Sequence, residues 1–159
     1  MQTEVKKSIT KERFVDLFEK NRKLLSTNDT ISLSEIREKA FTFFTKLGFP
    51  NTGMEAWRQT DLTESFDRGY DYHLNPREEA DVLKVFRCNI PHLDTAVIGQ
   101  LNGWYVSKDV PLMKLGNGII MGSLAEARKK YPQLVEKYYG TIADDTTDGF
   151  TALNTAFAQ

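Results

Sequence analysis

The sequence contains a single cysteine, Cys88, and only two histidines. One cysteine excludes a disulfide within the chain, and nothing in the composition points to an oxidising compartment. The same shortage limits metal chemistry, because a metal–sulfur cluster is usually held by four thiolates or by two thiolates and two imidazoles. One copy of this chain lacks that ligand set, so we expect it to hold no cofactor.

Long hydrophobic runs and an excess of one charge are also lacking. Lys and Arg total 21 against 22 Asp and Glu, which gives a formal net charge of -1. This balance provides no overall attraction to nucleic acid or to an anionic membrane. No apolar stretch approaches the roughly 20 residues that span a bilayer, and no apolar signal region follows the polar segment 1–7. We therefore expect a cytoplasmic protein that binds neither nucleic acid nor membrane.

What the chain does contain is enough apolar material for a folded core. It has 159 residues, of which 40% are hydrophobic, including ten Phe, six Tyr and two Trp. This composition is typical of an ordinary soluble protein and not of a disordered one. The length suits one domain, or one domain with a separate terminal element.

Two helices are predicted for the first 48 residues. In residues 10–25, the apolar side chains Phe14, Leu17 and Phe18 recur at near-helical spacing. A second helix is expected to begin after Ser32, because Ser32 and Glu35 have the spacing of a capping box. Its predicted apolar face consists of Leu33, Ile36, Ala40, Phe43, Phe44 and Leu47. Gly48, followed by Phe49-Pro50, is a strong helix stop. Residues 1–48 are therefore predicted to form a helical hairpin.

The middle of the chain is predicted to contain short antiparallel strands. Residues 82–88, 95–101 and 104–106 have the alternation and the side chains that favour strands. Asn102-Gly103 is the preferred pair for a type I′ hairpin turn, since both central residues need positive φ. Ile119-Ile120-Met121 reads as a short buried strand.

Helices are predicted again towards the end of the sequence. Ser123 and Glu126 form a second capping box, and Pro132 begins a further helix that closes at Gly140. Asp148 is the predicted cap of a last helix, with an apolar face made of Phe150, Leu153 and Phe157. We expect that face to pack on a segment that follows residue 159. The predicted fold class is α+β, with residues 49–159 forming one mixed region.

Candidate metal ligands gather around the single cysteine. Cys88, His92 and Asp94, with His73 more distant, are the cluster with suitable residue types, but their spacing matches no zinc-ribbon or zinc-finger pattern. The simpler interpretation is a packed cysteine at the end of a strand beside a loop histidine. A Cys–His nucleophilic pair would need an orienting third group that the sequence does not identify. We therefore assign no catalytic or metal-binding residue, and we expect a protein that is not an enzyme.

Three stretches of the sequence carry a resemblance to a known family. The first comprises Leu47–Pro50 and Glu55–Leu62, in which Trp57, Arg58 and Thr60 stand in a Trp-basic-x-Thr pattern. The second is Leu101–Tyr105 and the third is Gly118–Ala127. The third continues through Pro132, Tyr139-Gly140 and Phe150–Phe157. Their order and spacing resemble SufD of the SufB/SufD family over roughly residues 33–159. Gly53 and Gln59 depart from that pattern, which has a basic and an aromatic residue there.

The resemblance implies a scaffold role in the SUF machinery, which assembles iron–sulfur clusters. SufD-like proteins have an N-terminal helical region, a right-handed parallel β-helix and a C-terminal helical region that binds the SufC ATPase. They pair with SufB through the β-helices. By this resemblance, the present sequence is the N-terminal region that precedes the β-helix, its partners are SufB and SufC, and the residues with functional roles in the family lie beyond it.

Trp57, Arg58 and Thr60 are the residues that we expect to act as a docking site or a structural anchor. Trp and Arg dominate the binding energy of many interfaces, whereas a large aromatic side chain can equally fasten a loop to its own domain. Two other classes of function stay open. One is a free-standing adaptor that binds proteins through the aromatic helix 33–47 and the hairpin, and the other is a small metal-dependent enzyme that uses Cys88, His92 and Asp94.

Overall fold

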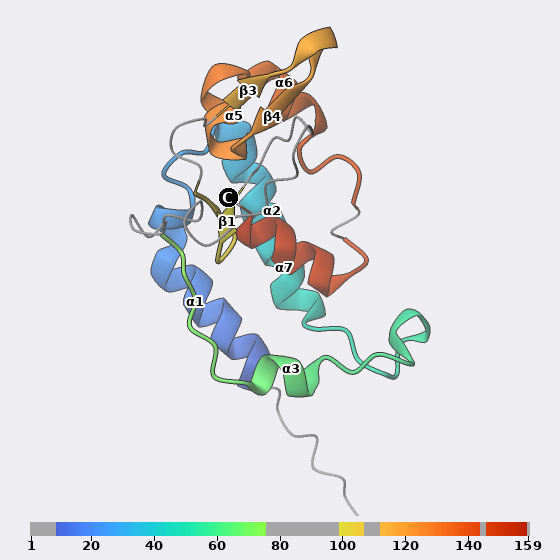
Figure 1. The fold of residues 1–159 in the computed structure, drawn as a ribbon. Helices are drawn as coiled ribbons and strands as arrows, with labels where there is room; N and C mark the ends of the chain where they lie inside the picture. Colours follow the sequence, from blue (N-terminus) through green and yellow to red (C-terminus); the bar gives the residue numbers. More distant parts are fainter. Residues whose placement is uncertain (1–8, 76–98, 107–111, 144–145, 159) are drawn as a thin grey trace, which may run out of the picture. The chain divides into compact units, whose positions relative to one another are not determined.

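The computed structural model describes residues 9–75, 99–106, 112–143 and 146–158. Within them lie six α-helices and two small antiparallel sheets, in agreement with the predicted α+β class (Figure 1). The chain divides into two compact units. The first comprises residues 1–71 and 136–159, and the second comprises residues 72–135.

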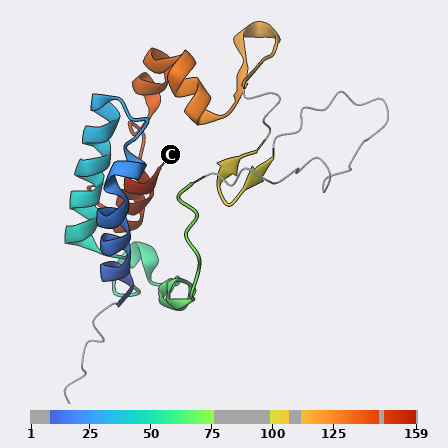
Figure 2. The same ribbon diagram turned by 90° about the vertical axis from the view of Figure 1, so that its left-hand side faces the viewer.

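Three helices form the core of the first unit. They are α1 (Ile9–Leu25), α2 (Ile31–Leu47) and α7 (Gly149–Phe157), which lie side by side in both ribbon views (Figures 1 and 2). The rings of Phe18 and Phe41 stack with centroids 3.9 Å apart, and Phe157 meets Phe18 edge-on at 5.6 Å. The buried apolar side chains are Phe14, Phe18, Leu25, Leu33, Ala40, Phe41, Phe44, Ala152, Leu153 and Ala156. Burial of this apolar surface is the main term that stabilises the unit.

The end of α2 is confirmed, but its start differs from the prediction. The N-cap is Thr30 and not Ser32: Thr30 has extended backbone angles, and its hydroxyl accepts a hydrogen bond from the Leu33 N–H at 3.4 Å. Ser32 already lies inside the helix, so it cannot have the non-helical backbone that a cap requires. At the other end, Gly48 has φ 68° and its N–H donates to the Phe44 carbonyl at 2.8 Å.

The buried face of α2 is rotated from the predicted one. Arg37 and Phe41 are buried, whereas Phe43 is half-buried and Leu47 is 38% exposed. The reason is that α2 is covered on two sides, by α1 and by α7, and the residues that face both neighbours are buried. A periodicity count finds the apolar residues of a helix, but it does not determine which neighbours cover them.

The last helix is capped by Asp148 as predicted, but its apolar face is not left open for a later segment. Leu153 is only 6% exposed, and the Phe157 ring contacts Phe14 and Phe18, so most of this face packs on α1 and α2. Only Phe150 stays 39% exposed. The helical unit is therefore built from residues 1–71 and 136–159, which are far apart in the sequence.

The second unit contains two short hairpins. Strands β1 (Gln100–Leu101) and β2 (Trp104–Tyr105) are antiparallel, with Gln100 opposite Tyr105. The predicted turn is confirmed, because Asn102 and Gly103 both have positive φ, 50° and 84°. Residues 100–101 of the strand expected at 95–101 form β1, whereas residues 95–98 and the strand expected at 82–88 lie outside the described residues.

The second hairpin pairs β3 (Leu112–Lys114) with β4 (Ile120–Gly122). Strand β4 includes Ile120 and Met121 of the strand expected at 119–121, but both are only half-buried, and Ile119, which precedes the strand, is 55% exposed. A two-stranded ribbon has one unpaired edge on each strand and cannot bury a strand on both faces. The sequence did not indicate β3, because its Leu-Met-Lys segment has no β-branched or aromatic residue.

Short helices follow the second hairpin. Helix α5 (Leu124–Lys130) begins at the predicted cap, where the Ser123 hydroxyl accepts from the Glu126 N–H. Helix α6 (Pro132–Tyr138) continues across the boundary between the two units. None of the helices that the structure describes has the length and apolar character needed to cross a membrane.

Candidate docking site around Trp57

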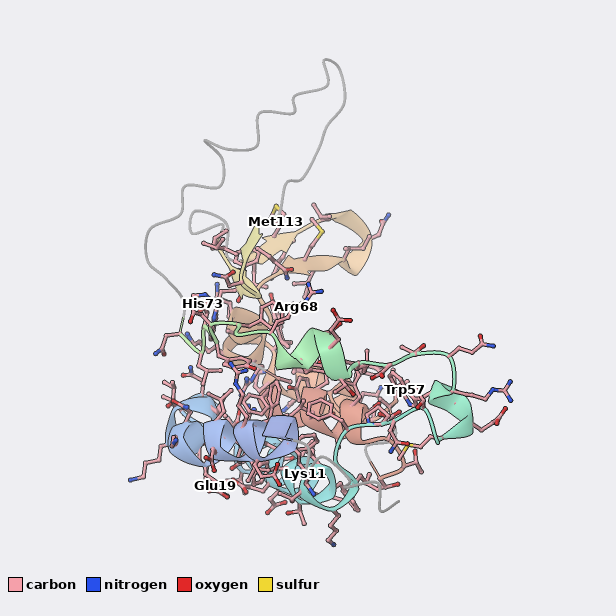
Figure 3. All side chains as sticks on the ribbon, turned by 90° about the horizontal axis from the view of Figure 1, so that it is seen from below. Lys11, Glu19, Trp57, Arg68, His73 and Met113 are labelled. Atoms are coloured by element: carbon pink, nitrogen blue, oxygen red, sulfur yellow. The ribbon has the colours of Figure 1, made fainter. Side chains whose placement is uncertain are left out.

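Trp57 lies in the loop between α2 and α3 (Thr63–Asp67), at the end of the 3-10 turn Glu55–Trp57. The side chain is half-buried, and its indole Nε1 donates a hydrogen bond to Asp148 Oδ2 at 3.0 Å. Figure 3 shows Trp57 on this loop, beside the helical core. The bond joins residues that are 91 positions apart in the sequence. Trp57 thus fastens the loop to the start of α7.

The two carboxylate oxygens of Asp148 accept hydrogen bonds from different parts of the chain. Oδ1 accepts the backbone N–H groups of Phe150 at 2.7 Å and Thr151 at 3.0 Å, while Oδ2 accepts the Trp57 indole. A carboxylate at this position satisfies donors that the helix cannot pair, and its negative charge complements the helix dipole. The position of the Trp57 loop and the start of α7 are therefore set by the same side chain.

Aromatic contacts continue from Trp57 into the core. Its ring meets that of Phe150 at 6.0 Å, Phe150 meets Phe66 of α3 at 6.0 Å, and Phe66 meets Phe49 at 4.6 Å. Phe49 then packs edge-on against the fully buried Phe44 at 5.3 Å. Edge-to-face pairs of this kind add stabilisation beyond the area that they bury. This row of rings connects a surface residue to the centre of the helical unit.

The surroundings of Arg58 and Thr60 differ from those of Trp57. The Arg58 side chain is 65% exposed and its nearest carboxylate, on Glu55, is 3.6 Å away. An exposed pair of this kind contributes little to stability. Thr60 is also exposed, and its backbone N–H donates to the Trp57 carbonyl at 2.9 Å. Trp57 thus holds the loop against the start of α7, whereas the Arg58 guanidinium is largely exposed to solvent.

The segment after the site is fixed by another carboxylate. Asp61 Oδ1 accepts the Thr63 N–H at 2.9 Å, at the start of α3. Hydrogen bonding from the Thr63 backbone, followed by that from its side chain, holds the pKa of Asp61 below its ordinary value. Arg13 of α1 reaches the far end of this segment, where it donates to the Tyr70 carbonyl at 3.1 Å. The loop is therefore held at several points along its length.

The candidate metal ligands are not brought together by the described part of the chain. Cys88, His92 and Asp94 lie outside the described residues. The backbone carbonyl of His73 accepts the Trp104 indole N–H at 2.7 Å, and His73 lines an open depression with residues of the β1–β2 hairpin. In the ranges that the structure describes, no group of three His, Cys, Asp or Glu side chains could hold a metal ion.

Replacement of Trp57 tests whether this residue acts as a structural anchor. Trp57→Phe keeps a ring but removes the indole donor, and we expect it to lower the free energy of unfolding by about 1 kcal/mol. Trp57→Ala also removes the aromatic contact, so we expect a loss of about 2 kcal/mol. Thermal melts followed by circular dichroism measure both, with exposed Thr60→Ala as the control. Unchanged melts for Trp57→Ala would contradict the anchoring role.

One comparison with known proteins agrees with the resemblance at the level of the SufB/SufD family. A family model described as "SufBD protein N-terminal region" matches residues 8–159. The match includes both compact units and the whole Trp57 site. No curated protein and no solved structure matches the chain.

Proposed function

The chain belongs to the SufBD protein family of the SUF iron–sulfur cluster assembly system, and from this premise we propose that it is the N-terminal domain of a SufD-type scaffold subunit. In this proposal the domain works in the cytoplasm within a SufB–SufC–SufD complex. A right-handed parallel β-helix follows the domain, and the cluster under assembly is handled by other parts of the complex. The observation that carries the proposal is the family match over residues 8–159.

The choice of SufD over SufB is supported by the Trp57 segment. The pattern Trp57-Arg58-x-Thr60 resembles SufD and not SufB. In the structure this segment has a defined conformation, because Trp57 is tied to Asp148 and its ring continues the aromatic row towards Phe44. A segment that is held in this way can present Arg58 to another subunit in a fixed position.

The proposal gives this domain a structural role and no catalytic one. One cysteine and two histidines are too few to supply the usual ligand set of an iron–sulfur cluster. The polar contacts of Asp148 and Trp57 hold helices and loops in place. The domain would thus shape the scaffold while SufB and SufC supply the chemistry.

Genetic complementation tests the proposal. We expect the protein that contains this domain to restore the activity of an iron–sulfur enzyme in cells that lack SufD, and not in cells that lack SufB. The same protein should co-purify with SufB and SufC at fixed stoichiometry. Rescue of the SufB-deficient cells would assign the chain to the other branch of the family, and failure in both strains together with no co-purification would reject the proposed complex.

A further inference from the structure

One surface of α2 combines apolar side chains with unpaired positive charge. We call Lys39, Phe43, Lys46 and Leu47 the lysine–phenylalanine face. Their spacing of four, seven and eight residues from Lys39 places them on one side of the helix. Phe43 is half-buried and Leu47 is 38% exposed, whereas the opposite side of α2 is packed on α1 and α7. This face is therefore the part of the apolar pattern that the helical core does not cover.

The two lysines flank the aromatic ring. The Nζ atoms of Lys39 and Lys46 lie 5.9 Å and 5.8 Å from the centroid of the Phe43 ring. Neither lysine forms an ion pair within the part of the chain that the structure describes. The carboxylate next to Lys39, on Glu38, is paired with Arg22 instead. The face thus presents two ammonium groups that are free to bind carboxylates, on either side of an apolar ring.

The C-terminal part of the same unit borders this face. A Cβ atom on Gly140 would lie 3.2 Å from Ile36 Cγ2, so the chain at Gly140 covers one end of the apolar pattern. At the other end, a Cβ atom on Gly149 would lie 3.4 Å from Leu47 Cβ. Phe43 lies between these two points, and its ring makes no aromatic contact with another described residue. The uncovered surface therefore has the extent of a few side chains, which suits a short segment.

From this arrangement we infer that the lysine–phenylalanine face docks an acidic amphipathic segment of a partner protein. Such a segment would place one apolar side chain on Phe43 and Leu47 and carboxylates beside Lys39 and Lys46. The apolar contact removes water, which strengthens the ion pairs at its rim and makes the match of charges specific. Nucleic acid fits less well, because the chain as a whole has a net charge of -1 and provides no overall attraction to a polyanion.

Charge reversal with a matched control tests the inference, which takes only its choice of partner from the proposed function. In the full-length protein, Lys39→Glu/Lys46→Glu should weaken association with SufB–SufC at least 10-fold, measured by titration calorimetry at low salt. Lys20→Glu/Lys23→Glu on α1 changes the net charge equally, and among the described residues no aromatic ring lies between these two lysines as Phe43 does between Lys39 and Lys46. We expect this control to bind like the unmodified protein. Equal binding by both variants would overturn the inference and leave the proposed function intact.

A crosslinking experiment identifies the occupant independently of the proposed complex. A photo-crosslinking amino acid at exposed Thr42, beside Phe43, should capture a peptide rich in Asp and Glu in living cells, whereas the same group at Lys20 should not. Lys39→Glu/Lys46→Glu should abolish the Thr42 product. If SufB–SufC does not bind at all, the proposed function fails. In that case, an acidic peptide that is captured from another protein, and whose capture is lost in Lys39→Glu/Lys46→Glu, still supports the docking surface. Capture of a second copy, of residues 72–135 of the same chain or of nucleic acid would overturn it.

Discussion

Gly149→Ala will lower the free energy of unfolding by at least about 3 kcal/mol, although alanine is the better helix former. A Cβ atom at Gly149 would overlap the carbonyl oxygen of Gly48 and would lie 3.0 Å from its carbonyl carbon. These are backbone atoms, and Gly48 is fixed by its own hydrogen bond to Phe44. The start of α7 must therefore move away from the end of α2, and the contacts between the two helices are lost.

The control is Gly69→Ala, in the same unit. A Cβ atom there meets nothing within 4 Å, and we expect the stability to change by less than about 0.5 kcal/mol. Urea unfolding of both variants gives the difference directly. For a protein of this length, a loss of 3 kcal/mol corresponds to a drop in melting temperature of roughly 6–12 °C. A Gly149→Ala variant as stable as the unmodified protein would show that α7 does not cross α2 this closely.

Arg37→Ala is expected to destabilise the protein by about 3–5 kcal/mol, because it leaves a buried carboxylate without its cation. The Arg37 and Asp29 side chains are 4% and 1% exposed, and Nε and Nη2 of Arg37 donate to the two carboxylate oxygens at 2.7 Å and 3.1 Å. The third donor, Nη1, binds the Ala156 carbonyl at 2.6 Å. Arg37 thus joins the segment before α2 to the last turn of α7, where its positive charge also complements the helix dipole.

The double variant Arg37→Leu/Asp29→Leu distinguishes a lost charge pair from lost packing. Removal of both charges leaves no unpaired ion, so we expect the double variant to be more stable than Arg37→Ala by about 2 kcal/mol. Arg37→Lys should fall between them, since an ammonium group cannot match a carboxylate and a carbonyl in the same planar geometry. Chemical denaturation measures all three. A double variant that is less stable than the single one would contradict this account, and would show that Asp29 stabilises the fold through contacts other than its ion pair with Arg37.

Local signals in the sequence predicted several elements well. The stop at Gly48, the caps at Ser123 and Asp148, and the turn at Asn102-Gly103 are all confirmed. Each depends on atoms within a few residues of one another, so the local sequence contains the required information. The cap of α2 shows the limit of this reasoning, because Thr30 and Ser32 are both good cap residues and only the backbone decides between them.

The Trp57 site could be predicted only in part. The sequence singled out Trp57, Arg58 and Thr60 through a motif, and it identified Asp148 as a helix cap. It gave no sign that Trp57 and Asp148 bond to each other, because 91 residues separate them. Nothing in the sequence indicated the ion pair between Arg37 and Asp29, because a charged residue on a helix is normally expected to face solvent. The docking role of Arg58 stays a prediction.

The sequence by itself determined most of the long helices, several of their ends and the hairpin turn, because these depend on short-range backbone preferences. Only the tertiary structure decided which apolar residues are buried. In the folded protein α7 packs against α2. This packing covers Leu153 and buries Arg37, and it leaves Phe43 half-exposed. The physical reason is that burial depends on which neighbour reaches a given face of a helix, and that neighbour is supplied by a segment more than 100 residues away.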